Sequence, residues 1–172
     1  MARYRRKRYY RKRARYSPNI VRIGPNSFNI QPQTREFGVT TLIENQGYDP
    51  SRSNTIITVK NPELSIEFEN SGNGLTNIES CTAYILFIPE GYTAGINTPI
   101  QHPEWIMAYK FYGSPNYDGG FSKFVNKIKT RLSRKLNTGD RIVLLVEATN
   151  TSQQYESTME YQGLVRWWTK AN

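Results

Sequence analysis

The stretch RLSRKLNTGDRIVLLVEA, residues 131–148, is the segment that most strongly indicates the fold. Its second half, 141–148, is an apolar run rich in β-branched residues, which is typical of a buried strand. The four residues before that run, Asn137-Thr138-Gly139-Asp140, are a turn signal. A turn placed directly before a core strand predicts that residues 131–148 form a hairpin.

The segment before this turn, residues 123–136, fits two structures. Val125, Ile128 and Leu132 have near-helical spacing, which favours an amphipathic helix. The residues from 127 to 132 also alternate between basic and less polar side chains, which favours a strand. We favour a strand in the second half of this segment, because the turn and the core strand follow it directly.

The rest of the chain reads as short strands separated by turns. ELSIEFE, residues 63–69, is the clearest, since its apolar and polar residues alternate as on a half-buried strand. No helical segments alternate with the strands, so we predict an all-β protein with a single jelly-roll β-sandwich over residues 35–172. The other predicted strands are 36–44, 54–59, 81–88, 105–112 and 163–169.

The first sixteen residues form an arm of a different composition. They contain nine of the 23 Lys and Arg residues, which leaves 14 basic residues in the body against 14 acidic ones. The formal charge of +9 therefore belongs to the arm. We predict that the arm is disordered when alone, since its charges repel and it has no apolar surface to bury. Such a tail is typical of a segment that binds a polyanion.

Nucleic acid is the polyanion that fits the arm best. Its cations neutralise phosphates, and its tyrosines offer rings on which unpaired bases stack, although these tyrosines also fit a role as mere spacers. The predicted nucleic-acid-binding residues are Arg3, Tyr4, Arg5, Arg6, Lys7, Arg8, Tyr9, Tyr10, Arg11, Lys12, Arg13, Arg15 and Tyr16.

A second basic cluster lies near the turn. It is either a contact for DNA or for sulfated glycans of a host cell, or a solvated strand face partly paired with Asp140 and Glu147. Its members are Lys123, Lys127, Lys129, Arg131, Arg134, Lys135 and Arg141.

Residues 17–34 are predicted to be a linker. Pro18, Pro25 and Pro32 interrupt this segment, and Gly24 and several Asn residues favour turns. Near the other end of the sequence, Trp167 and Trp168 must point to opposite sides of a strand. We expect one of them in the core and the other at a contact between subunits.

Enzyme chemistry and cofactors have little support in the composition. His102 is the single His and Cys81 the single Cys, so neither a disulfide framework nor a metal cluster is expected. We expect His102 on the surface and Cys81 packed as a small hydrophobe. The sequence also contains no run of about 18 apolar residues, as a membrane span requires, and no leader pattern, so no membrane insertion is expected.

Four stretches resemble the capsid proteins of the circovirus-like group, eukaryotic viruses with circular single-stranded DNA. The most specific is IKTRLSRKLNTGDRIVLLV, 128–146, which is similar to the basic strand, Asn-x-Gly-Asp turn and apolar strand of that family. The others are FIPEG (87–91), HPEWIMAYKFYGS (102–114) and GLVRWW (163–168). Two positions depart from the family pattern, namely 102–104, where a Glu-Pro-Asn type turn is expected, and Lys135, where Asn is more usual.

The resemblance implies a structural protein of the virion. It implies a closed icosahedral shell, expected to hold 60 copies in T=1 symmetry, with the arm inside on a circular single-stranded DNA genome. It also implies that the arm serves as a nuclear localisation signal read by host import receptors.

One alternative class stays open on the residues alone. A cellular nucleic-acid-binding module with a basic tail, of ribosomal or chromatin type, explains the arm. It does not explain a neutral body rich in buried strands, because such modules usually carry charge on the folded surface as well. A jelly-roll enzyme or lectin is disfavoured, because the chain lacks the His and carboxylate clusters of a metal site.

Overall fold

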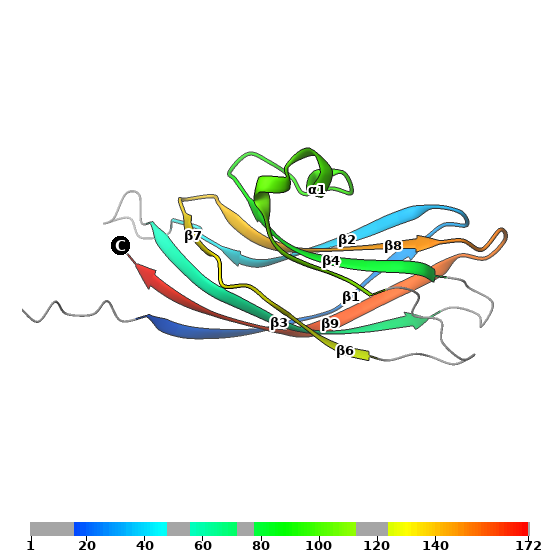
Figure 1. The fold of residues 1–172 in the computed structure, drawn as a ribbon, viewed down its shortest axis with the longest axis horizontal. Helices are drawn as coiled ribbons and strands as arrows, with labels where there is room; N and C mark the ends of the chain where they lie inside the picture. Colours follow the sequence, from blue (N-terminus) through cyan, green and yellow to red (C-terminus); the bar gives the residue numbers. More distant parts are fainter. Residues whose placement is uncertain (1–15, 48–55, 72–77, 113–123, 172) are drawn as a thin grey trace, which may run out of the picture.

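The computed structural model describes residues 16–47, 56–71, 78–112 and 124–171. In these ranges the chain forms two antiparallel sheets that face each other (Figure 1). Sheet A contains β1 (Ser17–Ile30), β9 (Ser157–Ala171), β3 (Ile57–Ser71), β6 (Phe124–Lys129) and β7 (Ser133–Leu136). Sheet B contains β2 (Arg35–Glu44), β8 (Arg141–Asn150), β4 (Ile78–Ile88) and β5 (Ile106–Phe111). The short helices α1 (Thr98–Gln101) and η1 (Pro103–Trp105) lie between β4 and β5.

The strand order confirms the predicted jelly roll. Sheet A has the order β1-β9-β3-β6, with β7 also paired to β3, and sheet B has the order β2-β8-β4-β5. Because β6 and β7 pair with successive parts of β3, they occupy one strand position between them. The described strands thus fill eight positions in two four-stranded layers, as in a double-sheet jelly roll.

The core lies between the two sheets and explains both sequence patterns. Leu64, Ile66 and Phe68 of β3 are almost fully buried, as their alternation predicted. They pack in the same cluster as the inward residues of β8, which include Ile142 and Leu144. Each such aliphatic side chain contributes roughly 1.5–3 kcal/mol when it leaves water.

Strand β8 is apolar on both faces for a specific reason. Its outward residues Val143 and Leu145 belong to a second cluster on the other side of sheet B. This cluster is covered by Phe37 and Tyr84 and by residues of the connection between β4 and β5, among them Trp105. The continuous apolar run of the sequence therefore reflects a strand with cover on both sides.

The predicted linker over 17–34 is wrong for most of its length, because residues 17–30 are strand β1. β1 is the edge strand of sheet A and pairs only with β9 in the described sheet. Proline is compatible with an edge strand, where its missing N–H is not needed for the ladder. Gly24 and Pro25 lie in a register shift between Ile23 and Asn26, where the ladder is interrupted.

The predicted hairpin over 131–148 is also wrong, although both of its strands exist. β7 pairs with β3 in sheet A, whereas β8 belongs to sheet B. The turn at 137–140 therefore carries the chain from one layer to the other. Asp140 is buried in this turn, where its carboxylate accepts hydrogen bonds from the backbone N–H groups of Asn137 (2.8 Å) and Glu90 (3.1 Å). The helical alternative for 123–136 is excluded for residues 124–136, which form β6, β7 and the extended residues between them.

The remaining predicted strands are present with changed limits. Residues 57–59 of the segment expected at 54–59 and the whole of 63–69 belong to one strand, β3, which has a register shift between Lys60 and Glu63, whereas residues 54 and 55 lie outside the described residues. The strand expected at 105–112 is β5, and Trp105 belongs to η1 instead. The strand expected at 163–169 is the second half of β9.

Candidate nucleic-acid interface

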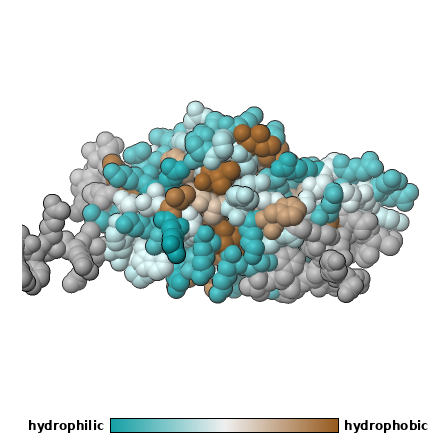
Figure 2. Space-filling model, in the orientation of Figure 1, coloured by the Kyte–Doolittle hydropathy of each residue, from teal (hydrophilic) through white to brown (hydrophobic). Residues whose placement is uncertain are grey.

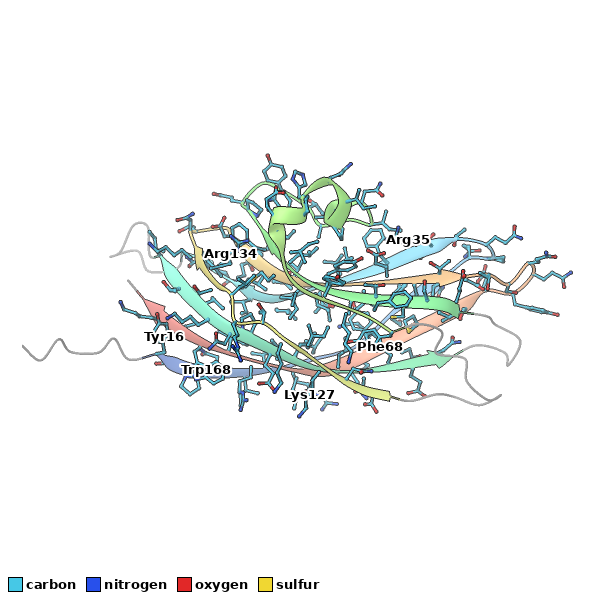
Figure 3. All side chains as sticks on the ribbon, in the orientation of Figure 1. Tyr16, Arg35, Phe68, Lys127, Arg134 and Trp168 are labelled. Atoms are coloured by element: carbon cyan, nitrogen blue, oxygen red, sulfur yellow. The ribbon has the colours of Figure 1, made fainter. Side chains whose placement is uncertain are left out.

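Tyr16 is the one residue of the predicted arm that the structure describes. Residues 1–15, including the predicted disorder and the basic residues of the arm, lie outside the described residues. The Nζ atom of Lys60 lies 4.4 Å from the centre of the Tyr16 ring, which is a cation–π contact. Ser17 pairs with Thr169 and Lys60 pairs with Trp168, so the arm joins sheet A at this end of β9. Figure 3 shows Tyr16 and Trp168 at the same end of the sheet.

The register of sheet A builds three rows of side chains across its outer face. Residues that pair directly on neighbouring antiparallel strands project to the same face and lie about 4.5–5.5 Å apart. The first row is Pro18, Trp168, Lys60 and Ser133; the second is Ile20, Arg166, Glu63 and Lys129; the third is Arg22, Leu164, Ser65 and Lys127. We call this surface the three-row face.

Two cations of the three-row face bind one carboxylate. Arg166 donates to Glu63 at 3.0 Å, and the Nζ atom of Lys129 lies 3.2 Å from the other oxygen of the same group. The guanidinium of Arg166 also lies 5.2 Å from the centre of the Trp168 ring. Hydrogen bonds from Arg166 first, and then from Lys129, lower the pKa of Glu63 from its ordinary value of 4.5.

The lowered pKa of Glu63 predicts a small contribution to stability that is lost in acid. Because the folded-state pKa is depressed, the contribution is complete above the ordinary value of 4.5 and is lost as pH falls through the folded-state pKa. Glu63→Gln is expected to flatten this part of the stability curve by less than about 1 kcal/mol, as for other exposed pairs. Urea unfolding between pH 3 and 7 measures it, and a variant whose curve matches that of the wild type in shape would contradict it.

The charges on the outer face of sheet A are separated along the strands. The three rows hold Arg22, Lys60, Lys127, Lys129 and Arg166, and among their described residues only Glu63 is acidic. Farther along β3 and β9, the outward positions are occupied by Glu67, Glu69 and Glu160. The body is thus neutral in sum, but it presents a basic surface where the arm begins. The neutrality of the sequence is therefore no argument against a nucleic-acid contact on the folded body.

The second basic cluster of the sequence does not form one patch. Lys127 and Lys129 lie on the three-row face, and Lys135 pairs with Thr58 beside it. Arg134 donates to the Glu104 carbonyl and Arg141 to the Tyr92 carbonyl, both at 2.6 Å, so these two hold the connection between β4 and β5. Arg131 is exposed between β6 and β7, and Lys123 lies outside the described residues.

The predicted acidic partners of that cluster are corrected by the structure. Asp140 accepts hydrogen bonds from the backbone of its own turn and of Glu90. Glu147 is buried on sheet B and pairs with Arg35 of β2. Neither carboxylate screens the basic side chains of β6 and β7 in the way that the sequence suggested.

Sequence reasoning missed four basic or aromatic members of the three-row face. Arg166 and Trp168 could have been found from β9 alone, because residues 164, 166 and 168 share one face of a strand. Trp167 is 7% exposed and belongs to the core, whereas Trp168 is half-buried on the outer face, so the predicted division of the two rings is confirmed. The subunit contact expected for one of them stays a prediction. Arg22 and Lys60 needed the register, since one lay in the supposed linker and the other between two supposed strands.

In the orientation of Figures 1 and 2, the sandwich is seen from its edge, and the outer face of sheet A lies along its lower side. Figure 2 shows mainly hydrophilic residues along this lower side and hydrophobic residues in the middle of the edge, where the two sheets face each other. Lys127 projects downward there in Figure 3, on the same side of the sheet as Trp168. Cations and one aromatic ring thus share an open, flat surface rather than a cleft.

The remaining singled-out residues have structural positions. Burial raises the pKa of Cys81 to about 12, so its thiol is protonated at neutral pH and packs as a small apolar group. His102 stacks on Trp105 with ring centres 3.8 Å apart, at the surface of the β4–β5 connection. No helix in the described ranges is long and apolar enough to cross a membrane.

Comparisons with known proteins show a distant structural similarity. No protein-family model matches the chain, and no curated protein matches its sequence. Among solved structures, the chain is similar to one in the structure of infectious bursal disease virus Gx strain, with a TM-score of 0.34 and 12% identity. The match covers 91% of this chain and 32% of the other, so this chain spans about a third of the length of the protein it matches.

Proposed function

We propose that this protein is a viral coat protein that assembles into a small icosahedral shell and packages circular single-stranded DNA. The observation that supports this most is the jelly-roll order of the two sheets with a cationic arm entering at one end of sheet A. Jelly rolls are common in viral capsid proteins, although lectins and cupins share them. The four stretches that resemble circovirus-like capsid proteins lie at β4, η1–β5, β6–β8 and β9, and so extend over both sheets.

The arm binds the genome through its charge in this proposal. Neutralising a phosphate of a single strand gives a salt slope of about −0.7, so nine engaged cations give a slope of about −6 per subunit. Binding of this kind reads the backbone rather than the bases, which suits a protein that must package a whole genome. The same cationic segment fits a nuclear import signal.

Charge balance sets a further condition on the shell. About 60 subunits in closed symmetry bring about 540 positive charges from their arms. The 172 codons for this chain alone supply 516 phosphates, and a genome that also encodes a replication protein supplies more. We therefore expect purified particles to contain small cations, and no catalytic role is proposed for the chain.

Assembly is the property that tests the proposal first. The full chain, expressed and treated with nuclease in moderate salt, is expected to give uniform closed shells with nuclease-resistant DNA inside. Negative-stain electron microscopy detects the shells, and extraction identifies the nucleic acid. Dispersed monomers that still bind nucleic acid, also in the presence of circular single-stranded DNA, would instead favour the tailed cellular module, for which the basic three-row face is a supporting feature.

A further inference from the structure

We infer that the three-row face is a second nucleic-acid contact on the folded body, at which an unpaired base stacks on Trp168. Phosphates of the same strand would be bound by the cations of the neighbouring rows. This inference rests on the proposed function, in that it assumes a nucleic-acid ligand. It goes beyond the arm, because none of the residues of the three-row face belongs to that segment.

The spacing of the rows carries the electrostatic part of the argument. Successive outward residues on one strand are about 6.6–6.8 Å apart, and neighbouring strands are about 4.8 Å apart. Lys127 and Lys129 are successive outward residues of β6 and lie within a Debye length of about 8 Å at physiological salt, whereas Arg22 and Arg166 lie about one Debye length apart on the diagonal between β1 and β9. The fields within each pair add, and all four side chains are exposed.

The aromatic ring identifies the class of ligand. Trp168 is half-buried on the outer face, with the Arg166 guanidinium 5.2 Å from its ring. A ring beside cations on an open surface is the arrangement by which proteins bind single strands, since every base has a face that stacks. A sulfated glycan also satisfies the cations, but it has no base for the ring. A duplex keeps its bases paired and stacked, so it satisfies the cations alone.

The position of the arm makes the two contacts continuous. Tyr16 contacts Lys60, which pairs with Trp168 in the first row. Only Lys60 therefore separates Tyr16, the last ring of the arm, from Trp168. A nucleic-acid strand bound by the arm can continue directly onto Trp168. The carboxylates of Glu67, Glu69 and Glu160 occupy the outward positions beyond the third row. We therefore place the bound nucleic-acid strand along the rows, from β1 toward β6, and not along the length of β9.

The test compares two labelled oligonucleotides of equal charge. One is a 20-residue oligothymidylate and the other an abasic strand of the same length, and both are titrated with the full chain by fluorescence anisotropy at several salt concentrations. Trp168→Ala is expected to weaken thymidylate binding by about 5- to 100-fold and to leave abasic binding unchanged within about twofold. Tyr109→Ala is the matched control, because this ring is 65% exposed on the other sheet. It is expected to change neither affinity.

The charged residues are tested on the same two oligonucleotides. Lys127→Gln with Lys129→Gln is expected to reduce the magnitude of the salt slope by about 1.4 for both strands. Glu63→Gln is expected to tighten both, since it removes the carboxylate that binds Arg166 and Lys129. Trp168→Phe keeps a ring and is expected to restore most of the preference for thymidylate, which separates stacking from a general loss of structure.

Several outcomes would overturn the inference. If Trp168→Ala lowers the affinity for both oligonucleotides equally, stacking is excluded. If it lowers neither affinity, a contact at this ring is excluded. Lysine changes that alter heparin binding but not DNA binding would favour a glycan surface instead. The assay does not require shells. If the natural chain forms shells and Trp168→Ala binds both oligonucleotides as tightly as the natural chain, this inference alone is rejected. If Trp168→Ala weakens only thymidylate binding and the natural chain forms no shells, the coat-protein proposal alone is rejected.

Discussion

Replacing Gly163 with alanine is expected to destabilise the protein more than any other single methyl group added to a described glycine. A Cβ atom at this position of β9 would lie 2.2 Å from the backbone oxygen of Ser65 and 3.1 Å from the Cα atom of Ile66. Both atoms belong to the backbone of β3, so no side-chain rotation relieves the contact. β9 is also held by β1 on its other side, and relief requires sheet A to open.

We expect Gly163→Ala to lower the free energy of unfolding by about 3–5 kcal/mol, a range reached only by the more severe core changes. The thermal midpoint would fall by about 6–20 °C for a domain of this size. Gly95→Ala is the matched control, because no atom lies within 4 Å of its Cβ position. Equal midpoints for the two variants, measured by circular dichroism, would show that β3 and β9 are less closely packed than described.

Deleting residues 1–15 is expected to have the largest effect on nucleic acid. The deletion removes all nine cations of the arm and leaves a body with equal numbers of basic and acidic residues. The salt slope for single-stranded DNA should fall in magnitude by about 6, and we expect any remaining binding to come from the three-row face. Shells formed by the shortened chain are expected to be empty, as shown by their ultraviolet absorbance ratio and by extraction of nucleic acid.

Two full-length variants with altered arms show whether the charge of the arm or the identity of its residues matters. An arm with every Arg replaced by Lys keeps the charge and should package DNA, because the attraction to phosphates depends on the number of positive charges. An arm with every Arg and Lys replaced by Gln should behave as the deletion does. If the Gln arm packages as much DNA as the natural one, the arm is not the packaging element, and the folded body would have to supply it.

The sequence predicts the parts of this fold that depend on local pattern. Leu64, Ile66 and Phe68 alternate with polar residues, and their burial follows from period two alone. β1 was missed because prolines were interpreted locally, whereas their tolerance comes from the position of β1 at the edge of sheet A. The pairing of β7 was missed because a turn signal shows that a chain reverses, but not which layer receives the next strand.

The candidate site divides in the same way. The arm is visible in composition, and Lys127 and Lys129 are visible as one face of an alternating segment. The second row also needs Glu63 and Arg166, which are about a hundred positions apart in the chain and become neighbours only through the register of β3 and β9. That register depends on which strands are adjacent, and so the sequence shows the cations without showing that they share one face of sheet A with Trp168.

The central position of β9 has a consequence for how each copy is made. The first and last described strands are neighbours, since Ser17 pairs with Thr169, and β3 flanks β9 on the other side. On the ribosome, β1 and β3 emerge long before the strand that joins them, and at about 5–20 residues per second this delay lasts seconds. A chain halted before residue 157 retains two unpaired strand edges and has no Trp168. Sheet A closes only after residues 157–171 have been translated, so an unfinished chain leaves β1 without the strand with which it pairs.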